Sequence, residues 1–496
     1  MRTLAALLLT AFSLCADVVE QGPKDARPSG LLAGVARVDI TPPVGIAHLN
    51  WGSQTHVEAI GIDPAGMLAT ALVLSDGRQK FAMVDVDCLH TLGFEPIVER
   101  AAKLTGIPPS HIRIAGTHTH SGPAFQRDKG PVGEDPAPYE SMIRNYEATL
   151  SDKIAGAIWA ADRNLRPVHA YGAKGTGTIN MNRRVRATAD KPPAVGLNPE
   201  GFVDRDLVVI RIDDAQGKPY AVLVNFQCHG TVLTYENKFV SPDWVGKTRA
   251  VVEQAMPGAL CLYFQGAAGN QGPMEGGTGD LTVAHRLGSI LGHQAAALAL
   301  QVETVDRAPT LEGYVESTAF AVKQPWRVKG PRDATLKFVS ATLSLPPRTY
   351  TPEEIDRMTK QVAAAKQQIA SAAADPWKKH QAEARLRRFS DLLAKWTAPP
   401  ATKPVEVDVQ ALRIGPMVIV AMPGEPFAEI GVAVKKASPF PVTMFCGYST
   451  GKGGDYMPIR SEYAHGGYEV ERSPYGVGAA EELVAETTAL IRKLRD

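Results

Sequence analysis

The sequence predicts a mixed α/β protein in which sheets and helices form layers, with a helical hairpin inserted late in the chain. Short apolar runs that end at Gly, Pro or polar residues are typical of strands, and several occur along the chain. Between them lie segments whose apolar residues recur every three or four positions, as in amphipathic helices. Strands that alternate with helices favour a layered α/β domain.

The individual elements follow from these two periodicities. One expected helix carries apolar residues at positions 143, 146, 150, 154 and 157, and a second begins after Asp280. A third helix is expected close to the end of the chain. In order, strands are expected at 81–86, 112–116, 207–212, 221–226, 260–264 and 417–421, and helices at 138–163, 281–300 and 479–494.

The segment 351–395 differs from the rest because it is rich in Ala, Lys, Gln, Glu and Arg. We expect it to form a helical hairpin that breaks at Asp375–Pro376, since proline disfavours helix in the residue before it. Its polarity indicates an excursion from the core. Two interpretations stay open: the hairpin covers a cleft, or it is a solvated structural arm.

Composition and charge exclude several classes of protein. At 44% apolar and 21% charged residues the chain is typical of a globular protein. Its 53 Lys and Arg against 52 Asp and Glu leave a net charge of +1 and no long basic block, so we expect no nucleic-acid partner. The sequence does not indicate the oligomeric state.

The N-terminus has the pattern of a signal peptide. Arg2 precedes an apolar run over residues 4–14, which is too short to cross a membrane but has the length of a signal-peptide core. We therefore expect a signal peptide over residues 1–16, export to the periplasm or the medium, and no transmembrane segment in the mature chain. The alternatives are a buried N-terminal helix and a lipid anchor at Cys15.

Four cysteines remain after that cleavage, and each is far from the others in sequence. None forms a CxxC or zinc-knuckle pattern. Buried free thiols are the expected state, and an exported location leaves a disulfide possible. The four are Cys88, Cys228, Cys261 and Cys446.

Histidines follow two of the predicted strands. His118 and His120 come directly after 112–116 and face the same way in an extended chain, and His229 ends the run that starts at 221. Imidazole suits zinc, and a catalytic zinc site commonly combines three protein ligands, often including a carboxylate, with an open position. Glu425, just after 417–421, offers a carboxylate. The pattern predicts a metal site, although each histidine is also compatible with a packing or surface role and Glu425 with a helix cap.

Five segments, in order, resemble the catalytic domain of neutral ceramidases. They are residues 33–43, 116–123 with their His-Thr-His-Ser, 225–229, 422–426 and 456–468, and together they extend from about residue 32 to 469. The resemblance implies a zinc-dependent hydrolase domain over residues 30–496 that cleaves a linear amide (N-acyl) bond, as in N-acyl sphingosine. Ligand type alone leaves another divalent metal open.

The resemblance also implies roles for single residues. It assigns a Zn²⁺ site to two histidines, a glutamate and a tyrosine. It makes His120 a group that handles the substrate or a proton, and it places Tyr468 against the substrate carbonyl. Arg183 matches the arginine of an Asn-Arg motif, although Arg184 and Arg186 lie close by. The implied zinc ligands are His118, His229, Glu425 and Tyr456.

The chain departs from the family at two places. The family's catalytic serine stands in a Gly-Asp-Val-Ser-Pro loop, where this chain has Gly269-Asn270-Gln271-Gly272-Pro273. Since Gly272 has no nucleophile, we expect attack by zinc-bound water, with Asn270 or loop amides supporting the oxyanion, and Ser121 as the alternative nucleophile. The family also continues into an immunoglobulin-like domain; this chain stops at Asp496, so no such domain is expected.

The expected function is therefore a ceramidase-like zinc amidohydrolase acting on a small-molecule or lipid acyl amide. Two alternatives stay open: a zinc esterase or lactam hydrolase with a smaller, non-lipid substrate, and a catalytically silent ligand-binding homologue. Asp85 and Asp87, at the end of the strand at 81–86, either orient a metal ligand or cap the strand. Residues 447–452 lack the spacing of a phosphate loop and are expected to be an ordinary loop.

Overall fold

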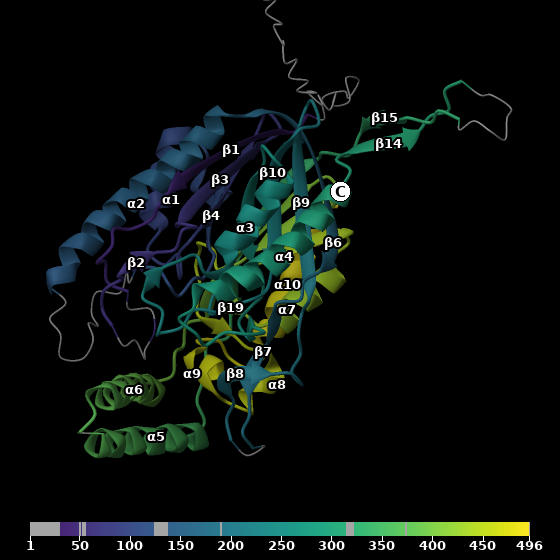
Figure 1. Ribbon diagram of the computed structural model, residues 1–496. Coiled ribbons are helices and arrows are strands. Elements are labelled where there is room, and N and C mark those ends of the chain that lie inside the picture. Colours follow the sequence, from purple (N-terminus) through teal and green to yellow (C-terminus); the bar gives the residue numbers. More distant parts are fainter. Residues whose placement is uncertain are drawn as a thin grey trace, which may run out of the picture.

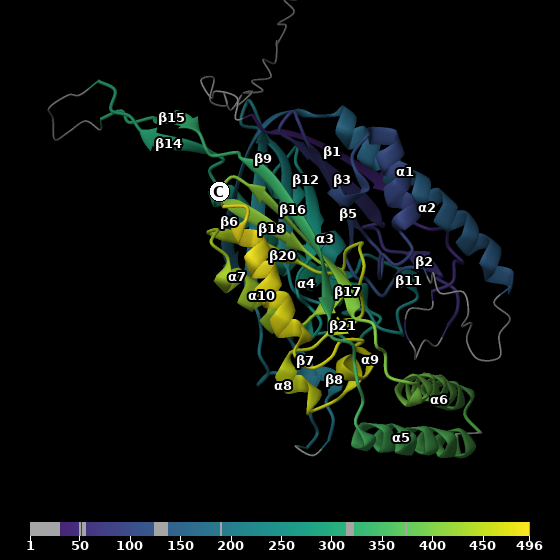
Figure 2. The same ribbon diagram turned by 180° about the vertical axis from the view of Figure 1, so that it is seen from behind.

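The computed structural model describes residues 30–48, 51, 56–123, 137–188, 191–313, 322–372 and 374–495. Two packed sheets lie between helices, so the predicted mixed α/β layers are confirmed (Figures 1 and 2). Every element expected from the sequence is present, with ends that differ by two residues at most. The expected signal peptide, residues 1–16, lies outside the described residues.

The larger sheet has eight strands in the order β12-β10-β9-β6-β1-β3-β4-β5. β4 runs parallel to β5 and β10 runs parallel to β12, while the other neighbours are antiparallel. The carboxyl ends of both parallel pairs carry residues that the sequence singled out. The strands are β1 (Leu32–Asp39), β3 (Leu68–Ser75), β4 (Lys80–Val86), β5 (Ile112–Gly116), β6 (Arg166–Thr176), β9 (Asp206–Asp214), β10 (Pro219–Phe226) and β12 (Leu260–Gln265).

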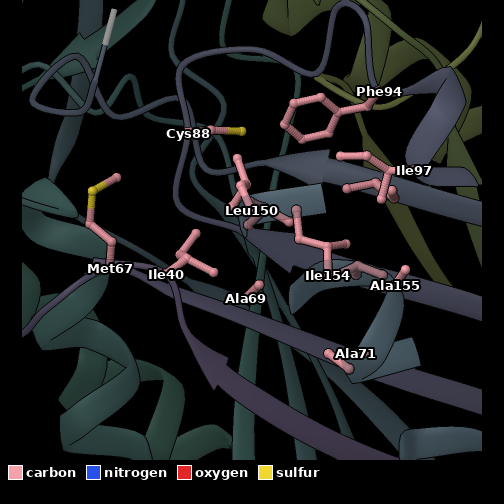
Figure 3. Close-up of a cluster of buried hydrophobic side chains, with 14 of the residues drawn as sticks. Ile40, Met67, Ala69, Ala71, Cys88, Phe94, Ile97, Leu150, Ile154 and Ala155 are labelled. Atoms are coloured by element: carbon pink, nitrogen blue, oxygen red, sulfur yellow. The ribbon is translucent and has the colours of Figure 1, made fainter. Parts of the chain in front are cut away.

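Helices α1 (Glu95–Thr105) and α2 (Ala137–Arg163) cover one half of the outer face of this sheet. Figure 3 shows the apolar cluster between these helices and the sheet, in which Leu150 and Ile154 of α2 lie against Ala69 and Ala71 of β3. The apolar residues whose helical spacing predicted α2 are therefore those that it buries against the sheet. The other half of that face is covered by α3 (Asp243–Ala255) and α4 (Leu281–Gln301).

The smaller sheet, in the order β16-β17-β18-β20, packs against the inner face of the larger one. Ile419 and Met444 of the small sheet share a core with Ile210 and Leu262 of the large sheet. Its other face is covered by α7 (Ala428–Ala437) and α10 (Ala479–Arg492), as Figure 2 shows. The strands are β16 (Leu336–Leu345), β17 (Val405–Ile414), β18 (Met417–Ala421) and β20 (Val442–Cys446).

The inserted hairpin consists of α5 (Pro352–Ser371) and α6 (Pro376–Thr397), so the predicted helical hairpin is confirmed. Thr351 and Glu354 form a capping box at the start of α5. The hairpin lies at one end of the molecule beside α9 (Tyr468–Arg472) (Figures 1 and 2). A second hairpin, β14 (Val305–Pro309) and β15 (Trp326–Pro331), projects from the opposite end (Figure 1).

Short elements complete the fold. β2 (Gly61–Ile62) pairs with β11 (Phe239–Val240), and β7 (Asn180–Val185) lies between β8 (Ala194–Asn198) and β13 (Gln271–Pro273). β19 (Glu425–Pro426) pairs with β21 (Tyr456–Met457). The remaining elements are the 3₁₀ turn at Pro109–His111 and the short helix α8 (Arg460–Tyr463).

The four cysteines of the expected mature chain are all buried, and none of them forms a disulfide. This confirms the expectation of buried free thiols. Among the described residues, no helix combines the length and the apolar character needed to span a membrane.

Candidate metal centre

The predicted metal-site residues lie where strands of both sheets end. His118 follows β5, His229 follows β10, and Glu425 follows β18. The two histidine segments also contact each other directly, because Thr119 forms a parallel bridge with Gly230. The strand ends therefore bring together side chains that are more than 300 residues apart in sequence.

Four side chains converge on a point between these loops. The Nε2 atom of His229 lies 3.0 Å from Oε2 of Glu425, and Nε2 of His118 lies 3.4 Å from the same oxygen. Nε2 of His120 lies 3.3 Å from Nε2 of His118. The ligand atoms of the three histidines lie within 4.8 Å of one another.

The backbone fixes the tautomers of two of these histidines. Nδ1 of His118 lies 2.6 Å from the Leu89 carbonyl oxygen, and Nδ1 of His229 lies 2.8 Å from that of Ala268. Each Nδ1 is therefore the protonated nitrogen, and each Nε2 presents its lone pair to the centre. Nδ1 of His120, by contrast, is buried and has no hydrogen-bond partner among the described residues.

The protonation states leave an excess of acceptors at this point. Burial and the nearby Arg183 lower the pKa of His229 to about 3, and burial also lowers the pKa of His118. Burial would raise the pKa of Glu425, but its polar neighbours, among them the permanently charged Arg183, hold it below its usual value. At neutral pH two imidazole lone pairs thus face an ionised carboxylate, an arrangement that a cation would stabilise.

The distances fit zinc. Zinc forms bonds of about 2.0–2.1 Å to nitrogen and oxygen, so neighbouring ligand atoms of a tetrahedral site lie about 3.3 Å apart. The contacts of His118 and His229 with Glu425, at 3.4 and 3.0 Å, are close to that value. Nitrogen and carboxylate ligands are also those that zinc commonly uses. The residues present can therefore hold this ion.

Tyr456 lies beside this group because its strand β21 pairs with β19, in a register that sets Tyr456 opposite Glu425. Its hydroxyl accepts a hydrogen bond from Nη2 of Arg183 at 3.0 Å, and Nε of Arg183 donates to Glu469 at 3.0 Å. Arg184 turns instead to Glu462 and Glu469. Of the clustered arginines considered from the sequence, Arg183 is the one that contacts Tyr456.

Tyr468, the first residue of α9, stacks edge-on against Tyr456 with ring centroids 5.4 Å apart. Burial raises the pKa of Tyr468, so its phenol keeps its proton at neutral pH. Its hydroxyl forms no hydrogen bond with any residue that the structure describes. The phenol is therefore available as a donor to a bound molecule.

Two other predicted residues are engaged elsewhere. The Asn270 side chain accepts a hydrogen bond from the amide of Ala428 at 2.9 Å and donates one to Glu429 at 2.8 Å, which ties it to the start of α7. Ser121 is fully buried, and Asn237 donates to its hydroxyl at 3.0 Å. The oxyanion role of Asn270 and the nucleophile role of Ser121 stay predictions.

Gly272 lies in β13 beside the arginine that holds Tyr456. A Cβ atom at this position would lie 3.4 Å from Cβ of Arg183, which is an ordinary contact. The residue that the sequence resemblance sets at the position of the family's serine thus lies next to Arg183, where the space accepts a small side chain.

Asp85 and Asp87 form an ion-pair network under the His118 loop. Arg249, which is buried, donates to Asp85 at 2.9 Å and also to Asp87. Asp87 in turn accepts a hydrogen bond from the hydroxyl of Thr117, the residue before His118. Of the two predicted roles, a supporting position behind a candidate ligand fits these contacts better than a strand cap.

Three further residues of the centre were not singled out from the sequence. The Tyr448 ring packs on His118 at 4.5 Å between centroids, and its hydroxyl lies 3.5 Å from Glu425. The centroid of the Trp51 ring lies 4.6 Å from that of the His120 ring. Burial lowers the pKa of His90, and the nearby His118 lowers it further. His90 follows β4, so extending the strand-end argument beyond Asp87 would have found it, whereas Tyr448 follows β20, which was not among the predicted strands.

Known proteins support the family suggested by the sequence. Residues 31–268 match the family "Neutral/alkaline non-lysosomal ceramidase, N-terminal". Neutral ceramidase A of Dictyostelium discoideum is 29% identical over 153 residues, and neutral ceramidase of Pseudomonas aeruginosa is 22% identical over 471 residues. The aligned part covers 31% of this chain and 21% of the Dictyostelium protein, and 89% of this chain and 69% of the Pseudomonas protein.

The fold is also similar to that of the Pseudomonas protein. The crystal structure of neutral ceramidase from Pseudomonas aeruginosa superposes with a TM-score of 0.60 at 20% identity, covering 95% of this chain and 75% of that chain. At this identity the superposition concerns the fold. The sequence match and the shared fold confirm the resemblance drawn from the five ordered segments. Residues 31–268 of this chain are thus similar to the N-terminal domain of neutral/alkaline non-lysosomal ceramidases.

Proposed function

We propose that the protein is a zinc-dependent hydrolase that cleaves the amide bond of an N-acyl compound. His118, His229, Glu425 and Tyr456 would hold the ion, and His120, Tyr468 and Arg183 would act around it. When bound, the ion would supply Lewis acidity, which makes water a nucleophile near neutral pH and polarises a carbonyl group. We also propose that the chain is exported.

The proposal rests on three hydrogen-bond acceptors, two histidine Nε2 atoms and the Glu425 carboxylate, that face one another with no donor between them. Two Nε2 lone pairs and one carboxylate meet within 3.0–3.4 Å, while the pKa of each imidazole is lowered. A purely structural cluster would place hydrogen-bond donors opposite these acceptors, because unpaired buried acceptors are unfavourable.

The Nδ1 atoms, which point away from the centre, indicate which of the three histidines are ligands. Metal-bound histidines almost always donate the second ring nitrogen to a carbonyl or carboxylate. His118 and His229 do so, whereas Nδ1 of His120 has no partner in the part of the chain that the structure describes. His120 is therefore better suited to take a proton from the attacking water or to give one to the leaving amine.

The other residues would stabilise the charge that develops on the substrate oxygen. The protonated phenol of Tyr468 can donate a hydrogen bond to that oxygen. Arg183 positions Tyr456 through its 3.0 Å hydrogen bond and keeps a positive charge near the centre. With Gly272 at the serine position, the chain offers no hydroxyl there, which favours attack by water over a covalent serine intermediate.

The first experiment measures zinc content and hydrolysis together. The full chain, purified with zinc, should contain one equivalent of metal and should hydrolyse N-acyl substrates. His229→Ala should lose both properties, whereas His120→Ala should keep the metal and lose about 100-fold or more of its kcat, the usual effect of removing a general acid or base.

His169→Ala is the matched control, because His169 is a buried histidine on β6 that belongs to no ligand cluster of the described chain. It should keep its zinc. A full metal equivalent in His229→Ala would overturn the ligand assignment. A zinc-loaded wild-type protein that hydrolyses esters or lactams but no linear amide would overturn the proposed bond type, and one that hydrolyses no acyl substrate would overturn the enzymatic function.

A further inference from the structure

The inserted hairpin reaches the candidate metal centre through one side chain. The guanidinium carbon of Arg388, on α6, lies 4.4 Å from the ring centroid of Tyr468. Nη2 of the same arginine donates to Glu471 at 3.1 Å. Both partners lie on α9, beside which α6 runs in Figures 1 and 2. Of the two interpretations of the hairpin, a wall of the site fits these contacts and a merely solvated arm does not.

Arg388 has hydrogen-bonding capacity left. Its side chain keeps 37% of its surface exposed, and its buried Nε has no hydrogen-bond partner within the described segments. The Glu471 contact uses Nη2, and no described carboxylate other than Glu471 forms an ion pair with Arg388. A guanidinium carries five N–H donors in a fixed plane and binds carboxylate, sulfonate and phosphate groups through two of them at once.

The surroundings of Tyr468 carry an excess of positive charge. Arg388 and Arg357 both face Glu471, and Arg472 pairs with Asp455 at 3.0 Å. Three guanidinium groups therefore meet two carboxylates.

Deeper in the site, Arg183 and Arg184 face Glu429, Glu462 and Glu469. The excess of positive charge is therefore local to the contact between α6 and α9. An uncharged lipid such as a ceramide has no group that would use this arrangement.

We infer that the site selects an acyl-amide substrate carrying an oxyanion group, and that Arg388 of the hairpin binds this group. The inference rests on the proposed amide hydrolysis and names the substrate class. The anion lies on the α6 side of Tyr468, so it can belong to the amine part or to the acyl part of the substrate. In either case the amide carbonyl stays next to the Tyr468 phenol.

Two matched pairs of substrates test this inference with the zinc-loaded full chain. N-octanoylglycine and N-octanoylethanolamine share the acyl chain and differ by a carboxylate on the amine side. N-butylsuccinamate and N-butyl-4-methylpentanamide differ by a carboxylate on the acyl side. The wild-type kcat/KM should favour the anionic member of at least one pair by about 10-fold or more, the range of a hydrogen bond to a charged group.

Variants then assign the preference to Arg388. Arg388→Gln should reduce the anionic preference, which is the ratio of kcat/KM for the two members of a pair, about 10-fold, mainly through the KM of the anionic member. Arg388→Lys should keep part of the preference, because it keeps the charge but not the bidentate geometry. Arg387→Gln is the control, because Arg387 is an exposed neighbour on the same helix.

The outcomes separate this inference from the proposed function. If the neutral amides are hydrolysed as well as the anionic ones and Arg388→Gln changes neither, the anion site is wrong and the hydrolase stands. If no amide is hydrolysed, the hydrolase is wrong, and calorimetric titration of N-octanoylglycine still tests the site: Arg388→Gln should bind it about 10-fold more weakly than Arg387→Gln. Should Arg388→Gln fail to fold or to hold zinc, a wild-type preference for the neutral members would by itself overturn the inference.

Discussion

The ion-pair network under the His118 loop predicts that Arg249→Met destabilises the protein strongly. Arg249, Asp85 and Asp87 are each at most 1% exposed. Methionine fills much of the volume of arginine but leaves two buried carboxylates without their counter-charge. Breaking a buried ion pair by removing one partner costs about 3–5 kcal/mol, and we expect a loss of free energy of unfolding in this range at pH 7.5.

The loss should depend on pH in a defined direction. Burial raises the pKa of Asp85 to about 6, although Arg249 acts to lower it, so removing Arg249 raises it further. A carboxyl group whose folded-state pKa lies above its unfolded value binds its proton more tightly in the folded state, and it loses stability as the pH rises through that window. At pH 5 the carboxyl is protonated, so the loss should be smaller than at pH 7.5 by about 1.4 kcal/mol for each unit by which the pKa of Asp85 rises in the variant.

Urea unfolding followed by circular dichroism at both pH values measures these differences. Arg100→Met is the matched control, because Arg100 forms an ion pair of 2.6 Å with Asp152 on the surface, where both side chains are more than half exposed. Its loss should stay below about 1 kcal/mol. Equal losses in the two variants, or a larger loss for Arg249→Met at pH 5 than at pH 7.5, would refute the reasoning from desolvation. Since Asp87 holds Thr117, the same variant should also bind zinc about 10-fold more weakly.

Three further predictions concern packing, pH and metal. Gly34→Ala should lower the free energy of unfolding by about 3 kcal/mol, because the new Cβ would lie 1.9 Å from the Ala161 carbonyl oxygen. Gly156→Ala is the control: nothing lies within 4 Å of its Cβ, so it should stabilise α2 by up to about 1 kcal/mol. A tolerated Gly34→Ala in urea or thermal unfolding would contradict the close approach of β1 and α2. Burial lowers the pKa of His48 to about 4, so the stability that the neutral imidazole contributes to the folded state is lost as the pH falls below about 6.5. In His48→Asn the free energy of unfolding should therefore fall by about 2 kcal/mol less between pH 7 and pH 5 than in the wild type. Parallel pH profiles of the two proteins would contradict this. Removing metal with a chelator should lower the unfolding temperature, and zinc at about 100 times its Kd should restore about 2.7 kcal/mol; an unchanged unfolding temperature would argue against a bound ion.

Local patterns were sufficient for most of the fold. The stripe that ends at Ala157 predicted α2, and the Asp375–Pro376 break predicted two separate helices in the inserted segment. These features depend on neighbours within a few positions, where periodicity and backbone preference act directly. The pairing of β10 with β12, and of β18 with β20, depends on contacts between distant segments, which such patterns do not specify.

The candidate site shows the same division. The rule that functional side chains follow strand ends found His118, His229 and Glu425 from the sequence, and the family resemblance added Tyr456 and Tyr468. It stopped at Asp85 and Asp87 for the strand at 81–86 and so missed His90, and no strand was predicted ahead of Tyr448. It also did not show that Asn270 is engaged by α7, which depends on hydrogen bonds across more than 150 residues of sequence.

The sequence by itself determined the layered α/β class, the inserted hairpin and the chemical types gathered in the site, because each of these is encoded by residue type and short-range spacing. Only the tertiary structure decided which nitrogens of the histidines face one another and that Arg388 of the hairpin lies against Tyr468. Both depend on the packing of β5, β10, β18 and α6 in three dimensions, where distance and burial set the charge state of each group.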